Sequence, residues 1–198
     1  MAFDFFSALF LFAFVSTVTP GPNNLMLMAS GANFGFQRTI PHMLGIATGV
    51  ALMILLVGAG LIQIFDAVSW SYDVLKIACV GYMGFLALKI LRSAPQESQV
   101  DASSKPFSAM QAVLFQWVNP KAWSMVLSAI TLYSPDREMA NVLLIAGAFA
   151  TVNLPAISLW VVLGKEFKRF LSSPQRLQFF NTSMALLLLG SLYPILEI

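Results

Sequence analysis

Two short motifs of proline and polar residues interrupt long apolar stretches of this sequence. The first covers residues 19–24 (Thr-Pro-Gly-Pro-Asn-Asn), and the second covers residues 119–121 (Asn-Pro-Lys). Proline lacks an amide donor and its ring clashes with the carbonyl four residues back, so each motif is expected to break a helix. Proline is also favoured at the first position of a helix. Each motif therefore predicts that a new helix begins inside an apolar stretch.

A helix that begins inside a membrane can bind an anion. Its first amides have no partner within the helix, and its N-terminus carries roughly +0.5 charge. Carbonyls near residues 16–18 would also lose their partners, which is tolerated at that depth only where they face protein or a wet cavity. Two such helix starts together would form a binding site for a carboxylate, and Lys121 would add a full positive charge. In the alternative, the prolines only kink the helices and Lys121 caps carbonyls.

Other polar residues give weaker signals. Residues 151–155 (Thr-Val-Asn-Leu-Pro) are expected to break a third helix and to bring Asn153 to the same cavity. The single histidine, His42, and the single cysteine, Cys79, lie in separate segments, and no Asp or Glu lies deep in an apolar stretch. Metal binding needs clustered ligands, and nucleophilic catalysis needs an activating neighbour. We therefore predict no metal site, no cofactor and no enzymatic activity.

The composition indicates what must hold these motifs. Of the 198 residues, 58% are hydrophobic and 10% are charged, whereas about a quarter of the residues of a soluble protein are charged. The mean hydropathy is +0.79. The net charge of +2 gives no basis for binding nucleic acid. These values exclude a soluble enzyme and a nucleic-acid-binding protein, and they predict a polytopic protein embedded in a lipid bilayer.

Long uncharged stretches predict the spanning helices. Asp4 and Arg38 are separated by 33 uncharged residues, and roughly 20 apolar residues suffice to cross a bilayer. Six helices are expected, at about 6–34, 41–65, 72–91, 108–133, 140–163 and 177–196. The two proline motifs fall at the centres of the uncharged window 5–37 and of the window 106–135, so helices one and four are predicted to be broken at the membrane midplane.

A polar stretch at about 93–105 divides the chain into two repeats, at about 1–92 and 106–198, within a single transmembrane domain of residues 1–198. Each repeat has an odd number of helices, so the second enters the membrane from the opposite side. The predicted fold class is therefore an all-α membrane protein with six helices in two inverted three-helix repeats.

Basic residues predict the orientation. Two of them, Lys76 and Arg137, lie on one side of the predicted membrane. Eight lie on the other side, namely Arg38, Lys89, Arg92, Lys105, Lys165, Lys168, Arg169 and Arg176. The positive-inside rule then places both termini in the periplasm and the 93–105 linker in the cytoplasm.

Small residues at helical spacing predict close packing of helices. Gly45 and Gly49 form a GxxxG motif, and further glycines follow at positions 58, 60, 81 and 84. These stripes permit a homodimer without requiring one.

Taken together, the motifs resemble the lysine-exporter family (LysE/RhtB) of bacterial amino-acid efflux proteins. The likeness rests on residues 20–23 (Pro-Gly-Pro-Asn) and residues 119–121, and it extends over the whole chain. Gly45 and Gly49, residues 153–155 and residues 176–181 are similar to the branch with the cysteine/O-acetylserine and threonine/homoserine exporters. The resemblance implies a six-helix inner-membrane carrier that expels amino acids or close derivatives by proton antiport.

The predicted function is therefore that of a secondary transporter that exports a small amino acid or derivative across the bacterial inner membrane. The alternative is a structural or scaffold membrane protein that transports nothing. For a proton-coupled carrier, the titrating group is left open between Lys121, His42 and the substrate itself. The predicted substrate-binding residues are Pro20, Gly21, Pro22, Asn23, Asn24, Asn119, Pro120, Lys121 and Asn153.

Overall fold

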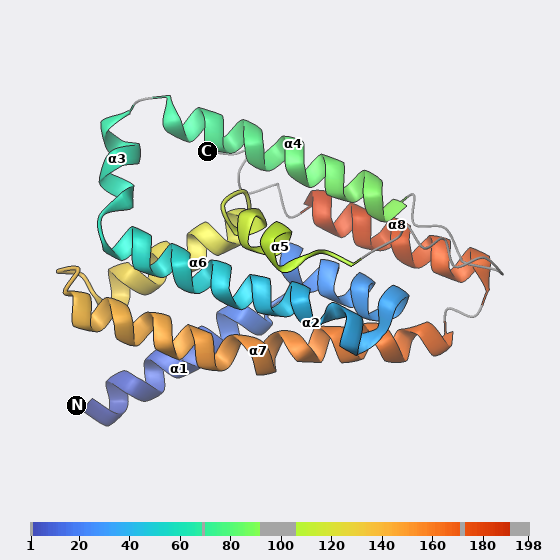
Figure 1. Ribbon diagram of the computed structural model, residues 1–198, viewed down its shortest axis with the longest axis horizontal. Helices are drawn as coiled ribbons and strands as arrows, with labels where there is room; N and C mark the ends of the chain where they lie inside the picture. The colour runs from blue at the N-terminus through green and yellow to red at the C-terminus, as the bar shows by residue number, and fades with distance from the viewer. Residues whose placement is uncertain (1, 69, 92–105, 171–172, 191–198) are drawn as a thin grey trace.

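The computed structural model describes residues 2–68, 70–91, 106–170 and 173–190. Every regular element in these ranges is an α-helix (Figure 1), so the predicted all-α class is confirmed for this part of the chain. The predicted linker at 93–105 lies outside it. The helices are α1 (Ala2–Val18), α2 (Pro22–Gly58), α3 (Leu61–Ala67), α4 (Ser71–Leu91), α5 (Ala109–Gln116), α6 (Pro120–Tyr133), α7 (Met139–Phe170) and α8 (Pro174–Gly190).

Among these elements, three contain apolar segments long enough to cross a membrane, at Pro22–Gly58, Ser71–Leu88 and Met139–Phe167. Two shorter apolar segments lie at Phe5–Val18 and Gln178–Gly190. Large apolar side chains also cover the outside of the molecule: Ile77 is 72% exposed and Phe179 is 76% exposed. A soluble monomer rarely exposes so many apolar side chains, and the surface is typical of a protein surrounded by lipid.

Both predicted breaks at the proline motifs are present. In the first, α1 ends at Val18 and α2 begins with Pro22 at its first position, after an extended Gly21. In the second, α5 ends at Gln116 and α6 begins with Pro120. The start of α5 is fixed by a capping box, in which the Ser108 side chain accepts from the Gln111 amide at 3.2 Å.

Between its first and second parts, α2 turns at Gly35, which has φ 78° and ψ 174°. The sequence predicted that one helix ends at about 34 and the next begins at about 41. The turn lies in this interval but takes only Gly35, because glycine adopts a positive φ at little cost. Gly31 packs on the second half of α7 and Gly58 on its first turn. The chain therefore runs along α7 in one direction before Gly35 and returns in the other, as the ribbon of α2 does in Figure 1, where it changes from blue to cyan.

The predicted break of the fifth helix is also wrong. Helix α7 continues from Met139 to Phe170 with Pro155 inside it. A single proline removes one amide donor, whereas the first motif combines two prolines with a glycine. Conversely, the predicted second helix at 41–65 is interrupted at Gly60, whose φ of 106° separates α2 from α3.

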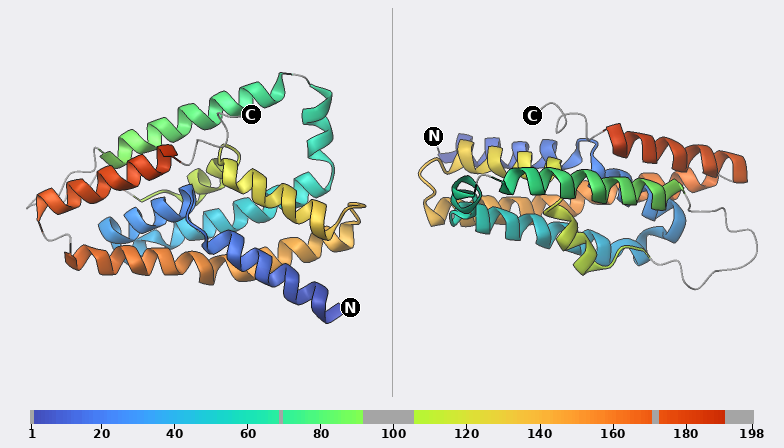
Figure 2. Two further views of the ribbon diagram at one scale, coloured as in Figure 1. Left: turned by 180° about the vertical axis from the view of Figure 1, so that it is seen from behind. Right: turned by 90° about the horizontal axis from the view of Figure 1, so that it is seen from above.

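The helices form two groups in space. Helices α1, α2, α5, α6 and α7 surround the main core, where α2 lies along both α7 and α5. Helices α4 and α8 pack against each other beside this group (Figures 1 and 2). Buried apolar side chains in the core include Ile46 and Met53 from α2 and Ile145 and Phe149 from α7.

Glycines set the closest helix contacts. A Cβ on Gly31 would meet the Val161 carbonyl of α7, and a Cβ on Gly164 of α7 would meet the Met28 carbonyl of α2. Gly45 and Gly49 approach the backbone of α5 in the same way. The prediction of a packing surface at Gly45 and Gly49 is thus confirmed.

For the two glycines of α4 the prediction differs from the structure. A Cβ at Gly81 or Gly84 would have nothing within 4 Å, so within the described part of the chain these two residues do not mediate close packing.

Candidate functional site

The two broken helices meet at a small internal cavity. Its volume is about 20 Å³, which is room for about one water molecule. Six of the nine predicted substrate-binding residues line it, namely Gly21, Asn23, Asn24, Asn119, Lys121 and Asn153. The remaining lining residues are Ser16, Thr17, Ile46, Val50, Ala122, Met125 and Ile157. Residues from both proline motifs, which are far apart in the sequence, therefore line one cavity.

The three predicted prolines do not line the cavity. Pro22 is buried, Pro120 is half-buried and Pro20 is exposed. Their contribution is to the backbone, since each helix starts where proline fixes the first helical residue.

At the start of α2 the helix amides lack a side-chain cap. The residue before the helix is Gly21, which makes no side-chain hydrogen bond, and Pro22 has no amide. The first amides of the helix are therefore those of Asn23 and Asn24. Together with the positive end of the helix dipole, they form an environment that favours an anion.

At the start of α6 the first backbone amides already donate hydrogen bonds within the protein. The Asn119 side chain accepts from the Lys121 amide at 3.2 Å, and the Asn119 carbonyl accepts from the Ala122 amide at 3.0 Å. The prediction of free amides at this second start is therefore wrong for the observed conformation, because asparagine is itself an effective N-cap. The positive end of the α6 dipole still faces the cavity through Asn119 and Lys121.

The carbonyls at the end of α1 have partners from three other helices, namely α2, α7 and, through Lys121, α6. Asn24 donates from Nδ2 to the carbonyls of Thr17 at 2.8 Å and Thr19 at 2.7 Å. Trp160 of α7 donates from Nε1 to the Val18 carbonyl at 3.0 Å. The Thr17 and Val18 carbonyls, which were expected to be freed by the break, are thus satisfied by protein, which is how irregular backbone is tolerated inside a membrane.

Lys121 connects the two breaks. Its ammonium donates to the Thr19 carbonyl, and its side chain lies directly over Gly21, where a Cβ would meet Cδ and would lie 3.3 Å from Nζ. The contact with Thr19 is the carbonyl cap that the packing alternative predicts. Lys121 also lines the cavity and is the charged residue of that lining. The same side chain therefore caps a carbonyl and borders the cavity.

A second connection joins the same two motifs. Asn23 donates from Nδ2 to Gln116 Oε1 at 2.8 Å, and Gln116 donates from Nε2 to Asn23 Oδ1 at 3.2 Å. Gln116 also donates to the Ala112 carbonyl at 2.8 Å and is fully buried. The sequence analysis missed this residue. A signal was available, since Gln116 lies three residues before Asn119 and is polar within an apolar helix.

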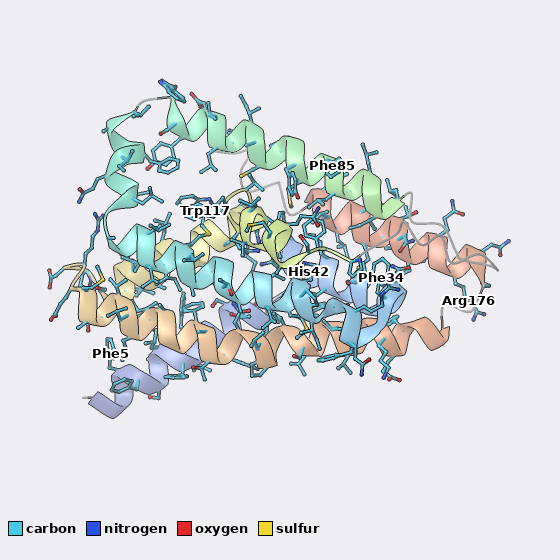
Figure 3. All side chains as sticks on the ribbon, in the orientation of Figure 1. Phe5, Phe34, His42, Phe85, Trp117 and Arg176 are labelled. Atoms are coloured by element: carbon cyan, nitrogen blue, oxygen red, sulfur yellow. The ribbon has the colours of Figure 1, made fainter. Side chains whose placement is uncertain are left out.

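Two lining groups have no hydrogen-bond partner, namely Thr17 Oγ1 and Asn153 Oδ1. Thr17 was also missed, because one threonine in an apolar helix carries no positional signal. Both ring nitrogens of His42 are likewise buried without partners, but His42 lies against Phe107, with 5.2 Å between ring centroids, and does not line the cavity. Figure 3 labels His42 on α2 and Trp117 beyond the end of α5.

Three tryptophans, Trp117, Trp123 and Trp160, pack near the two breaks in this conformation. Trp123 donates from Nε1 to the Trp117 carbonyl at 2.9 Å, and the two rings are 5.9 Å apart. Neither these two nor Trp160 lines the cavity.

Apolar helices of membrane-spanning length around a polar cavity define the class of helical membrane proteins with a polar internal cavity. The sequence matches the family described as LysE type translocator over residues 14–191. The chain belongs to this family, and the resemblance predicted from its motifs is confirmed.

Relatives with described roles cover nearly the whole chain. A homoserine/homoserine lactone efflux protein from Salmonella typhimurium is 21% identical over 98% of this chain and 94% of its own length. A cysteine/O-acetylserine efflux protein from Escherichia coli O139:H28 is 27% identical over 92% of this chain and 93% of its own length. The protein of the same description from Escherichia coli K12 is 27% identical over 82% of this chain and 84% of its own length. No solved structure matches the chain.

Proposed function

We propose that this protein is a secondary transporter that exports a small amino acid or amino-acid derivative across the bacterial inner membrane. The observation that carries the proposal is the cavity where two broken helices meet, lined by Lys121, four asparagines and the uncapped start of α2. The four asparagines are Asn23, Asn24, Asn119 and Asn153. Such a lining complements a small zwitterion better than an apolar or a purely cationic solute.

The substrate class is inferred from this chemistry and from the relatives. Cysteine, O-acetylserine, homoserine and homoserine lactone, the compounds in their names, all carry an amino group on the carbon next to a carbonyl. In our proposal the substrate carboxylate or carbonyl oxygen binds at the amides of Asn23 and Asn24, near the Lys121 ammonium. Because Lys121 donates to the Thr19 carbonyl in the observed conformation, the substrate must draw the ammonium away from that carbonyl.

The size of the cavity bears on the transport cycle. A volume of about 20 Å³ holds about one water molecule and no amino acid. The helices around the cavity must therefore separate before a substrate enters from the cytoplasm. Alternating access through six helices in two inverted repeats is the cycle that we propose.

The contacts between the two breaks support the inverted repeat. Lys121 follows Pro120 as Asn23 follows Pro22, and each side chain reaches the end of the other repeat's first half-helix. Lys121 reaches Thr19, beyond the end of α1, and Asn23 reaches Gln116, at the end of α5. An exchange of this kind is expected when a twofold axis in the membrane plane relates the two halves.

We propose inward proton flow as the driving force and Lys121 as the group that titrates. Lys121 is the ionisable residue among those that line the cavity, whereas His42 lies away from it.

Purified protein in proteoliposomes tests the proposal. Vesicles are loaded with radiolabelled L-homoserine, O-acetyl-L-serine or L-cysteine, and movement of the label across the membrane is followed with and without a pH gradient. We expect at least one compound to move several-fold faster than in protein-free vesicles, and faster still with the gradient. Rates equal to those of protein-free vesicles for all three compounds would favour the scaffold alternative, and a rate insensitive to the gradient would remove the proton coupling.

A further inference from the structure

Two polar atoms on the cavity wall are without hydrogen-bond partners, and they come from different helices. Thr17 is on α1 and is 7% exposed, and Asn153 is on α7 and is 1% exposed. Both residues line the cavity, and both Thr17 Oγ1 and Asn153 Oδ1 are buried and unpaired. A buried polar group without a partner costs about 1–3 kcal/mol. Two of them on one small cavity indicate that a ligand group pairs with them in another state.

Neighbouring hydroxyl groups do not share this property. Ser16 donates from Oγ to the Phe12 carbonyl at 2.6 Å, and Thr151 donates from Oγ1 to the Gly147 carbonyl at 2.8 Å. A hydroxyl in a helix normally uses the carbonyl four residues back in this way. Thr17 does not, so its oxygen remains free to face the cavity.

The chemistry of the two atoms favours a group that donates hydrogen bonds. An amide oxygen only accepts, and a hydroxyl oxygen accepts as well as donates. Thr17 also lies in the last turn of α1, where the helix dipole places partial negative charge. An ammonium group has three donors and a positive charge, and it matches both features.

We propose that Thr17 Oγ1 and Asn153 Oδ1 form the subsite for the α-ammonium group of the substrate. The proposal rests on the proposed function and assigns the orientation of the substrate within it. The ammonium faces α1 and α7, and the carboxylate or carbonyl faces the start of α2.

Lys121 selects between a zwitterion and a simple cation. Its ammonium lies on the same cavity and repels a second cation that arrives alone. A zwitterion brings its own negative charge, which offsets this repulsion. A sodium ion or a plain amine lacks that charge, so the subsite favours an amino acid over either of them.

The test compares a substrate with its counterpart that lacks the amino group. L-Homoserine is paired with 4-hydroxybutanoate, and O-acetyl-L-serine is paired with 3-acetoxypropanoate as a second probe. Transport of the labelled amino acid by proteoliposomes is measured for the wild type, Thr17→Val and Asn153→Leu, with the deamino compound as inhibitor. We expect KM for the amino acid to rise ten-fold or more in both variants. Inhibition by the deamino compound should change less than three-fold, because it never occupies the ammonium subsite.

Two further variants separate this role from a loss of structure. Thr17→Ser keeps the hydroxyl and should hold KM within three-fold of the wild type. Thr151→Val makes the same threonine-to-valine change one turn from Pro155 on an exposed position of α7 and should leave KM unchanged. Thr17 and Asn153 lie on different helices, so if one variant fails to insert, the other still tests the proposal.

The outcomes distinguish the subsite from the function. If the wild type moves neither these two amino acids nor L-cysteine, the proposed function fails, and the subsite fails with it. If the wild type moves them and both variants keep the wild-type KM, the subsite is wrong and the function stands. If the variants instead change a dependence of transport on sodium and keep the wild-type preference for the amino compound, the oxygens bind a metal cation, which also overturns the subsite.

Discussion

Lys121 is the residue whose two contacts lead to opposite expectations. As a cap for the Thr19 carbonyl it would be a structural element, and as the charge on the cavity it would attract the substrate carboxylate. A lysine inside a membrane costs at least ~2.5 kcal/mol on insertion scales. This cost favours a function beyond packing, and the two roles can be separated by substitution.

We expect Lys121→Arg to retain partial transport and Lys121→Met to lose it. Arginine keeps the positive charge, whereas methionine keeps most of the apolar stem and removes the charge. Transport rates are measured in proteoliposomes, normalised to inserted protein, over a series of external pH values. A purely structural Lys121 would give the reverse order, with methionine tolerated and the bulkier arginine harmful. Full activity of the methionine variant at every pH would remove Lys121 from the mechanism.

The paired amides of Asn23 and Gln116 give a second residue-level prediction. Because each side chain satisfies the other, either single change to alanine leaves a buried polar group unpaired, and the second change then costs little. In a double-mutant cycle we expect a coupling energy of about 0.6–1.7 kcal/mol, the range for hydrogen bonds between membrane helices. Unfolding of the purified protein in detergent measures it. Strictly additive effects would show that the two amides do not stabilise each other.

The residues that the sequence revealed are those whose chemistry is local. Gly21, Asn23, Asn119 and Lys121 could be predicted because proline motifs mark a helix start within a few positions, and the structure brings all four to one cavity. Gln116 and Thr17 could not be predicted in this way. Gln116 matters because it pairs with Asn23 of another helix, and Thr17 matters because its hydroxyl has no partner. Both properties depend on how distant helices pack, which a single sequence does not show.

The same distinction between local and distant causes holds for the helices. Both motifs break the chain where predicted, because two prolines with glycine, or asparagine with proline, leave the backbone few alternatives. Pro155 does not break α7, and Gly35 turns α2 without a proline. Both residues permit either outcome locally, since one proline removes a single amide donor and glycine accepts many backbone angles. The contact between α2 and α7 is a long-range feature that the sequence pattern does not contain.

Replacing Pro20 and Pro22 together with alanine tests the first break. Alanine restores two amide donors and favours helix, so α1 and α2 should tend to join and the uncapped start of α2 should disappear. We expect the protein to insert and to lose transport. Pro155→Ala is the matched control, because this proline lies within a continuous helix and is exposed, and it should transport normally. Normal transport by a well-expressed double variant would mean that the break is only a kink.

The crossing of α2 and α7 gives a prediction for stability. A Cβ on Gly164 would meet the Met28 carbonyl, whereas a Cβ on Gly147 of the same helix would have nothing within 4 Å. We expect Gly164→Ala to destabilise the fold by about 1–3 kcal/mol through overpacking. Gly147→Ala should be neutral, or stabilising by about 0.5–1 kcal/mol, because alanine favours helix. Thermal unfolding in detergent compares the two, and equal midpoints would contradict the close approach.

For the whole molecule, we propose that the two halves enter the membrane from opposite sides, and the contacts exchanged between the two broken helices support this arrangement. In that arrangement the 93–105 linker and both termini lie on different sides, and the distribution of basic residues determines which side each one faces. Eight Lys and Arg residues follow the first, third and fifth predicted spans and two follow the others, so the linker should face the cytoplasm.

Cysteine labelling in intact cells tests this orientation. Cys79 is buried in α4 and is first replaced with alanine, and single cysteines are then placed at Ala2 and at Ser98. An impermeant thiol reagent should label the cysteine at position 2 and should reach position 98 only after the cells are opened. The opened cells control for reactivity, since both positions must label there. Labelling at position 98 but not at position 2 in intact cells would reverse the orientation. Labelling at both would place the linker and the N-terminus on one side, which an inverted repeat of three helices does not permit.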